Sequence, residues 1–279
     1  MIKFEAVIYK YDMKDEAALK DVSIQIDRGS YVGIIGPNGC GKTTLIKHLN
    51  GLLLPSTGNV LVDGLNTKDT GKVREIRQRV GMIFQNPDNQ IVGMSVEEDV
   101  AFGPGNLGMP PAEIRYRVQK ALALVGMEAY NKRPPHTLSG GEKQLVAIAG
   151  VLAMNPLYIA LDEPTSFLDP SGQKKVLDVI RKLNGRGITM IHITHNMDEI
   201  VHADQIIVMK EGKILLVGKP KTVLTKFEWL NELGLGPPKI TELMWRFRRM
   251  GSNVRYDILT ADEACEEITA LIEREGFRP

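Results

Sequence analysis

The segment from Gly36 to Thr44 constrains the fold of this chain more than any other stretch. An apolar run, Tyr31 to Ile35, precedes it and predicts a short buried strand, and the apolar residues after it begin an amphipathic helix. A glycine-rich loop between a strand and a helix predicts a phosphate-binding loop, because its backbone N–H groups turn inward and the helix N-terminus favours negative charge. The alternative is a glycine-rich β–α turn that binds nothing.

Two side chains specify the chemistry of this loop. Lys42 is expected to reach the β- and γ-phosphates of a nucleoside triphosphate, and the Thr43 hydroxyl is expected to ligate Mg²⁺. The sequence therefore predicts a nucleotide-binding protein. The predicted nucleotide-binding residues of the loop are Gly36, Pro37, Asn38, Gly39, Cys40, Gly41, Lys42, Thr43 and Thr44.

Length and composition set the frame around this site. A chain of 279 residues can bury one large α/β core plus a small appendage, and 43% apolar with 25% charged residues is an ordinary globular composition. The net charge of +1 provides no field that would attract nucleic acid, so no nucleic-acid partner is expected.

The sequence also favours a cytoplasmic location. The longest apolar stretch, residues 145–154, is too short to span a bilayer, and residues 1–5 lack the apolar core of a signal peptide. A disulfide at Cys40 would obstruct the phosphate loop, which suits a reducing compartment. Any work at a membrane would therefore depend on a partner that holds the chain there.

Hydrophobic periodicity outlines an α/β core with two additions. Predicted strands cover residues 2–9, 22–27, 60–64, 80–84, 156–163 and 188–194, and a predicted hairpin covers 206–217. Residues 95–125 have helical character with a break at Gly103-Pro104-Gly105, and a further helix runs over 144–154. We expect about residues 88–157 to form a helical subdomain inserted into the α/β core.

A change in character after Pro220 predicts a small second domain. A linker at 234–238 separates two amphipathic helices from the rest of the chain, and the second helix opens with a capping box from Thr260 to Glu263. Their predicted buried residues are Ile240, Leu243, Met244 and Phe247 in the first helix, and Ala264, Ile268, Leu271 and Ile272 in the second. We divide the chain into residues 1–225 and 226–279.

Polar residues follow three of the predicted core strands. In parallel sheets the carboxyl ends of strands face the ligand crevice, so Gln85 is expected there, although its Asn-Pro-Asp surroundings also suit a simple turn. Asp162 is expected to hold Mg²⁺ through water and Glu163 to polarise an attacking water, the alternative being a helix N-cap. His195 is positioned to touch a γ-phosphate, whereas His192 is expected in the core.

Two further features complete the candidate site. Tyr11 either stacks on an adenine ring or simply packs. Ser139, Gly140 and Gly141 open a helix and form a second anion-binding helix start, which suggests that they serve a neighbouring molecule.

The order of these motifs resembles the ATP-binding cassette (ABC) family over residues 1 to about 225. In chain order the motifs are the phosphate loop, Gln85, Leu138-Ser139-Gly140-Gly141-Glu142, Leu161-Asp162-Glu163, Asp169 and His195. Glu142 stands where many members of the family carry Gln. The resemblance implies a P-loop NTPase fold of the ABC type, with an antiparallel β subdomain, a helical subdomain and a small C-terminal helical extension.

Three segments narrow the resemblance to the energy-coupling factor (ECF) class, the A-component ATPases of vitamin and cobalt or nickel uptake systems. They are Phe84 to Gln90, Val96 to Gly103 and Ala147 to Met154. Residues from about 230 also look like the small appended domain of that class, which is implicated in contact between ATPases. Gly105 stands where we would expect an acidic residue.

The resemblance implies roles for the candidate residues. Two subunits would sandwich two ATP molecules head to tail, with Gly36 to Thr44 of one facing Ser139 to Gly141 of the other. Glu163 would be the general base and His195 would contact the γ-phosphate. Gln85 would touch Mg²⁺ and sense the transporter, and Asp169 would bridge the subunits.

The resemblance also implies partners and a location. The second ATPase would be another copy of this chain or a paralogue. The membrane partners would be a transmembrane T-component, whose coupling helices dock near residues 85–108, and a substrate-binding S-component. The chain would then lie on the inner face of the cell membrane. The alternatives are a soluble ABC ATPase of DNA repair or ribosomes, and a regulatory subunit without catalysis.

Overall fold

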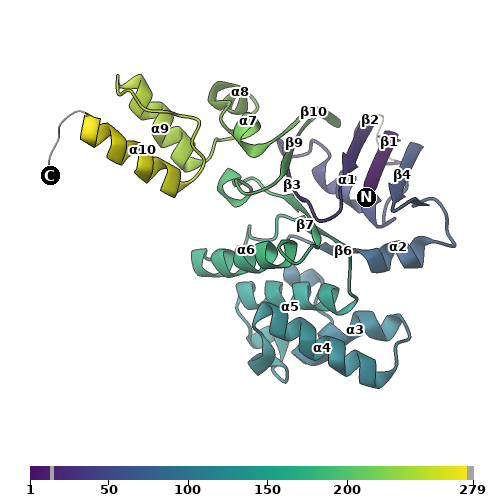
Figure 1. Cartoon of the computed structure of the whole chain (residues 1–279). Coiled ribbons are helices and arrows are strands. Elements are labelled where there is room, and N and C mark those ends of the chain that lie inside the picture. The colour runs from purple at the N-terminus through teal and green to yellow at the C-terminus, as the bar shows by residue number, and fades with distance from the viewer. Residues whose placement is uncertain (13–15, 275–279) are drawn as a thin grey trace.

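The computed structural model describes residues 1–12 and 16–274, which form the strands and helices shown in Figure 1. The strands are β1 (Ile2–Tyr9), β2 (Leu19–Ile26), β3 (Tyr31–Ile35), β4 (Thr57–Val62), β5 (Leu65–Asn66), β6 (Val80–Ile83), β7 (Tyr158–Asp162), β8 (Thr189–Ile193), β9 (Gln205–Lys210) and β10 (Lys213–Gly218). The helices are α1 (Lys42–Leu49), α2 (Val73–Arg79), α3 (Val96–Asn106), α4 (Pro111–Val125), α5 (Gly140–Ala153), α6 (Pro170–Asn184), α7 (Pro220–Leu224), α8 (Phe227–Glu232), α9 (Lys239–Arg249) and α10 (Ala261–Arg274).

Two sheets form the α/β core, as predicted. The larger sheet has six strands in the order β10-β9-β3-β8-β7-β6, with parallel pairing from β9 through β6 and an antiparallel hairpin of β9 and β10. The smaller sheet is antiparallel, in the order β2-β1-β4-β5. Since β3, β7 and β8 run parallel, the segments that follow them emerge at the same edge of the sheet.

Each face of the larger sheet packs against a different layer, because side chains alternate along a strand. Val32 and Ile34 of β3 point toward α1 and the smaller sheet. Tyr31 and Ile35 point the opposite way, toward α5 and α6 and the helices beyond them. Figure 1 shows this arrangement, with α3, α4 and α5 gathered on one side of the larger sheet. The phosphate loop therefore follows a strand that is buried on both faces.

The break predicted at Gly103-Pro104-Gly105 is wrong, because α3 continues through it to Asn106. Pro104 lacks an N–H group, but the turn after it is closed by bonds from Leu107 N to Gly103 O (3.2 Å) and from Met109 N to Pro104 O (3.3 Å). A Cβ at Gly103 would lie 2.9 Å from the Cγ of Met154, so the glycine allows close packing beside α5. Tertiary packing overrides the local propensity here.

Several shorter elements differ from the sequence expectation. Helices α2, α7 and α8 lie in segments for which the sequence analysis predicted no helix. Helix α5 begins at Gly140 rather than at residue 144, because the Ser139 hydroxyl and the Glu142 carboxylate form a capping box around its first turn.

Helices α9 and α10 enclose a small apolar cluster of their own, in the upper left of Figure 1. Its buried residues are Met244, Val254, Ile258 and Ala264. Leu243 and Ile272 were predicted to be buried, but they are 42% and 43% exposed, since two packed helices bury only a narrow stripe of each. Polar contacts tie this unit to the main body, including Lys239 N to Asp198 Oδ1 at 3.1 Å and Lys221 to Asp257 at 3.2 Å.

Replacing Met244 by Ala should destabilise the C-terminal unit by about 2–4 kcal/mol, because a fully buried side chain is lost from a cluster too small to repack. Hydrogen exchange should show faster exchange in α9 and α10 with little change in the core strands. Leu243→Ala is the matched control one residue away, and its half-exposed side chain should cost much less. Equal effects of the two substitutions would contradict this account of the cluster.

Candidate active site

A cavity of about 360 Å³ lies at the carboxyl end of β3, in front of the phosphate loop. Its lining combines the predicted loop with one of the predicted catalytic carboxylates. The lining residues are Tyr11, Glu16, Ala17, Ala18, Asn38, Gly39, Gly41, Lys42, Thr43, Thr44 and Glu163. The structure thus brings together Tyr11 and six of the nine phosphate-loop residues that were expected from sequence to bind nucleotide.

Two glycines of the loop are required by their surroundings. A Cβ at Gly36 would lie 2.3 Å from the carbonyl oxygen of Met209, and one at Gly41 would lie 2.6 Å from that of Ala18. Gly41 also has a φ of +107°, which side-chain-bearing residues rarely adopt. Cys40, between them, is buried, and burial raises the pKa of its thiol. This residue supports the loop from inside, and its thiol is protonated at neutral pH.

Lys42 directs its ammonium group into the loop. Its Nζ donates to the carbonyl oxygens of Gly36 (2.7 Å) and Pro37 (3.0 Å), and the residue is only 6% exposed. A buried ammonium held by backbone carbonyls places a positive charge at the loop opening, where the backbone N–H groups of the α1 N-terminus also point. The arrangement favours a polyanion such as a triphosphate.

Thr43 and Asp162 form a pair of oxygen donors beside the loop. The Thr43 hydroxyl donates to Asp162 Oδ1 at 3.1 Å. Burial and the neighbouring Glu163 raise the pKa of Asp162, and the Thr43 hydrogen bond, with Lys47 and Lys42, opposes this rise. Hydroxyl and carboxylate oxygens at this spacing suit Mg²⁺, which typically takes one or two carboxylates together with water and phosphate oxygens. The residues present therefore fit the ion.

Glu163 is held firmly at the end of β7. Its side chain contacts His195 Nε2 through Oε1 (2.8 Å), and it accepts from Gln85 Nε2 (3.0 Å) and Ser166 Oγ (2.9 Å) through Oε2. Its φ of +48° is uncommon for a residue with a side chain, which marks a conformation held in place by its surroundings. Gln85, Glu163 and His195 thus meet as expected, and Ser166, which the sequence analysis did not assign to the site, joins them.

A second carboxylate, the buried Glu199, binds the segments that carry Glu163 and His195. Glu199 accepts from Thr165 Oγ1 through Oε1 and from Thr194 Oγ1 through Oε2, each at 2.7 Å. Thr165 lies two residues after Glu163, and Thr194 directly precedes His195. Glu199 therefore ties the segment after β7 to the segment after β8, on which the two partners Glu163 and His195 reside.

Buried polar groups complete this support. His192 is in the core, as expected, with its Nδ1 2.8 Å from the Tyr31 hydroxyl and its Nε2 3.4 Å from Glu199 Oε2. Burial alone would raise the pKa of Glu199, but the adjacent His192 and the hydroxyls of Thr165 and Thr194 outweigh it and lower that pKa. Glu199 is thus a carboxylate at neutral pH, able to accept both threonine bonds.

Tyr11 borders the cavity, and its contacts are those of a packed side chain, while stacking on an adenine ring stays a prediction. Its hydroxyl lies 3.1 Å from Thr44 Oγ1, and its ring meets Tyr9 edge to face at 4.9 Å. The ring is thus fixed at the cavity wall by packing, in a position where a flat ligand ring can reach it.

Ser139, Gly140 and Gly141 lie outside the lining of the nucleotide cavity in the described chain. Ser139 and Gly140 are exposed at the start of α5, while a Cβ at Gly141 would lie 2.9 Å from the Cα of Gly172 in α6. Asp169 is exposed and caps α6 by accepting from Gly172 N at 3.2 Å. One chain therefore presents these residues on its surface rather than at its own phosphate loop.

Two relatives match the chain over nearly its whole length. The sequence is 56% identical over 270 residues to the cobalt import ATP-binding protein CbiO of Syntrophus aciditrophicus (strain SB), covering 97% of this chain and 96% of that protein. It is 54% identical to the energy-coupling factor transporter ATP-binding protein EcfA1 of Caldanaerobacter subterraneus subsp. tengcongensis, covering 92% and 93%. These relatives are transporter subunits and give no support to a soluble ABC ATPase.

Solved structures of two ATP-binding cassettes are also similar to this chain. CbiO1 from Clostridium perfringens, described as part of the ABC transporter complex cbiONQ, matches with a TM-score of 0.76 and 40% identity over 88% of this chain and 98% of that one. A dimeric post-hydrolysis state of the cassette MJ0796 bound to ADP and Pi matches with a TM-score of 0.71 and 32% identity, over 79% and 99%.

The described residues contain no helix with the length and apolarity needed to cross a bilayer. The sequence profile of the ABC transporter family matches residues 19–166, which include the phosphate loop, Ser139 to Gly141, and the two carboxylates Asp162 and Glu163 at the end of β7. Together with the relatives, this match places the chain in the ABC transporter family, as an ATP-binding and ATP-hydrolysing subunit of the energy-coupling factor class.

Proposed function

We propose that this chain powers an ECF-type importer by binding Mg-ATP at the phosphate loop and hydrolysing it with Glu163 as general base. The observation that carries the proposal is the Glu163 carboxylate, held by His195, Gln85 and Ser166 at the edge of the cavity that contains Lys42. An attacking water needs such an oriented acceptor beside the phosphates.

The groups around Glu163 have separate roles in this proposal. Lys42 and the loop N–H groups bind the β- and γ-phosphates, and Thr43 with Asp162 holds Mg²⁺, which supplies charge neutralisation when bound. His195 contacts the γ-phosphate and Gln85 contacts the ion. Tyr11 stacks on the adenine ring of the nucleotide. Because His195 and Gln85 already contact Glu163, γ-phosphate binding and carboxylate orientation are linked through direct contacts.

We further propose that a second ATPase subunit completes each site. The exposed helix start at Ser139 and Gly140 offers backbone N–H groups and a hydroxyl to a phosphate, and it lies outside this chain's own cavity. It would face the phosphate loop of the partner, with Asp169 bridging the two subunits. The solved cassette MJ0796 is dimeric, which supports pairing of two ATPases, and the second subunit is either another copy of this chain or a paralogue.

The membrane partners in this proposal are a T-component and an S-component, which hold the chain at the inner face of the membrane. Exposed apolar side chains gather near Gln85 and α3, where such a partner would dock: Val92, Met94 and Phe102 are 64%, 86% and 57% exposed. The name of one relative, a cobalt import ATP-binding protein, favours a transition-metal ion as the cargo, and the resemblance to the energy-coupling factor class adds a vitamin as the alternative.

Substitution of Glu163 by Gln should reduce the turnover of ATP at least about 100-fold, because the amide cannot accept a proton from water. The affinity for Mg-ATP should stay within about threefold, since the phosphate loop is untouched. Steady-state phosphate release and equilibrium binding of a fluorescent ATP analogue measure the two quantities. Ser166→Ala, which removes one hydrogen bond but leaves the carboxylate, is the control and should lose far less activity. Near-normal turnover in Glu163→Gln would contradict the role of Glu163.

Removal of the Glu199 carboxylate should slow hydrolysis without weakening ATP binding. Glu199→Ala leaves two buried threonine hydroxyls without their acceptor and releases the segments that carry Glu163 and His195. We expect a fall of at least about tenfold in kcat with little change in the dissociation constant of Mg-ATP. Glu199→Gln can still accept from one threonine and donate to the other, so it should retain most of the activity. Equal losses in both variants would argue for general destabilisation instead.

The mass of Glu163→Gln in solution should double on addition of Mg-ATP if the chain pairs with itself, because blocked hydrolysis traps the closed dimer. Light scattering with and without nucleotide measures this. A monomer at saturating Mg-ATP would point to a missing paralogue. A dimer that ignores nucleotide would instead implicate α9 and α10 as a standing contact.

A further inference from the structure

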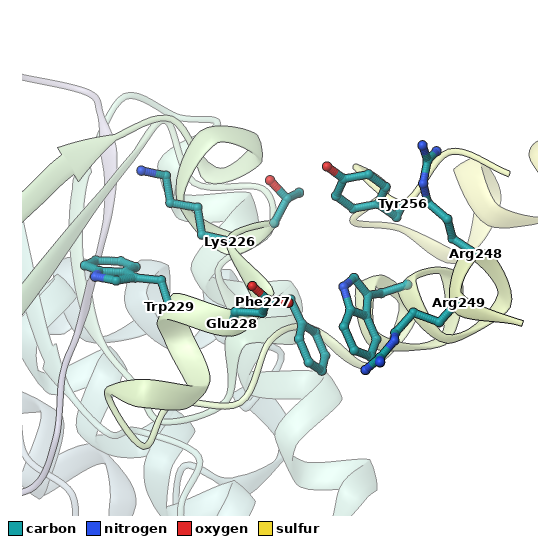
Figure 2. Close-up of a pocket in the computed structure, with 9 residues that line it drawn as sticks. Lys226, Phe227, Glu228, Trp229, Arg248, Arg249 and Tyr256 are labelled. Carbon is teal, nitrogen blue, oxygen red and sulfur yellow. The ribbon is translucent and has the colours of Figure 1, made fainter.

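A second cavity, of about 700 Å³, lies far along the chain from the phosphate loop, between α8 and the C-terminal unit. Figure 2 shows residues of α8 on one side of it and residues of α9 and the following loop on the other. None of its lining residues belongs to the lining of the nucleotide cavity. The function proposed above makes no use of it.

Aromatic rings form much of its wall. Phe227 of α8 stacks on Trp245 of α9, with centroids 4.0 Å apart and planes 11° from parallel. Trp229 and Tyr256 also line the cavity, and Tyr256 is 39% exposed. In Figure 2 the Tyr256 hydroxyl points from the α9 side toward the α8 side. Tyr256 is the exposed ring among them, and an exposed tyrosine ring is suited to stacking on a flat ligand ring.

Three cationic side chains line the same cavity, against a single carboxylate, Glu228. Each cation lies over an aromatic ring: Arg249 over Trp245 at 4.8 Å, Arg248 over Tyr256 at 5.2 Å and Lys226 over Trp229 at 5.7 Å. Such contacts orient a cation but leave its positive charge without a counter-ion.

Three cations outside the cavity, by contrast, form ion pairs with carboxylates. Arg246 pairs with Glu242, Arg255 with Glu267 and Lys221 with Asp257. Among the ion pairs of residues 1–12 and 16–274, none involves the three cations of the cavity. Lys226, Arg248 and Arg249 thus place three positive charges beside the aromatic side chains of the cavity, against the one negative charge of Glu228.

We propose that this cavity binds a small molecule made of a planar ring that carries a phosphate group. The ring stacks on the aromatic wall, and the phosphate takes the arginine hydrogen bonds, for which a guanidinium has matching geometry. A cationic or uncharged ring meets the same wall without the charge attraction and binds more weakly. Because α8 and α9 supply opposite walls, the bound molecule also fixes the C-terminal unit against the main body.

Flavin mononucleotide is a suitable probe of this class, and riboflavin carries the same ring without the phosphate. Stacking quenches flavin fluorescence, and both tryptophans of the chain line the cavity, so tryptophan emission reports on the same place. Full-length protein should bind flavin mononucleotide with a dissociation constant on the order of 100 μM or tighter, and riboflavin at least about tenfold more weakly. Inorganic phosphate should compete only at far higher concentration, since it lacks the ring.

Variants locate the binding. The double variant Arg248→Gln, Arg249→Gln should bind flavin mononucleotide at least about tenfold more weakly, and its affinity for riboflavin should change little. Arg246→Gln removes the same charge from the same helix outside the cavity, and it should leave both affinities unchanged. No quenching by the mononucleotide, equal affinities for the two flavins, or equal effects of the cavity and control variants would each overturn the proposal.

Discussion

Parallel pairing of β3 with β8, and of β8 with β7, is the constraint on which the candidate site depends. Backbone hydrogen bonds along these strands fix the register to the residue, for example Val32 beside Ile191 and Asp162 beside Ile193. The segments that follow the strands must then leave the sheet at one edge. Lys42, Glu163 and His195, which are distant in sequence, are therefore brought to the same edge, where direct contacts such as that between Glu163 and His195 orient the side chains.

Two carboxylates at this edge of the sheet have different roles. Glu163 lies at the cavity edge with both oxygens engaged, and Glu199 lies below it, buried, with both oxygens engaged by threonines. A buried carboxylate is costly unless every oxygen is satisfied, so Glu199 rigidly fixes whatever it binds. Strand pairing fixes the backbone positions of Glu163 and His195 but not the orientation of their side chains. The hydrogen bonds of Glu199 to Thr165 and Thr194 fix the segments that carry both residues, and so help to set that orientation.

Local motifs allowed the phosphate loop, the ends of the core strands and the α/β class to be predicted from sequence. Each depends on residues that are neighbours in the chain, such as Tyr31 to Ile35 followed by glycines. The Glu199 support could not be predicted, because Thr165 is 34 residues away and the acidic residues after His195 also suit a helix start. The prediction of a break within α3 was wrong for a related reason. Gly103 and Pro104 signal a break locally, but the packing of Gly103 beside Met154 decides the outcome. At Leu243 and Ile272, periodicity identified the apolar residues but not the width of the face that two helices bury.

The close approach of α5 and α6 has a mechanical consequence. Gly141 lies so near Gly172 that a single methyl group would not fit between them, and Gly172 donates its N–H to Asp169. The two helix starts are therefore packed backbone to backbone at Gly141 and Gly172, with the Leu168 side chain against Gly140. Because closely packed interiors transmit strain, we expect a displacement of Ser139 to move Asp169 with it. The two surfaces expected to meet a neighbouring subunit would then move together.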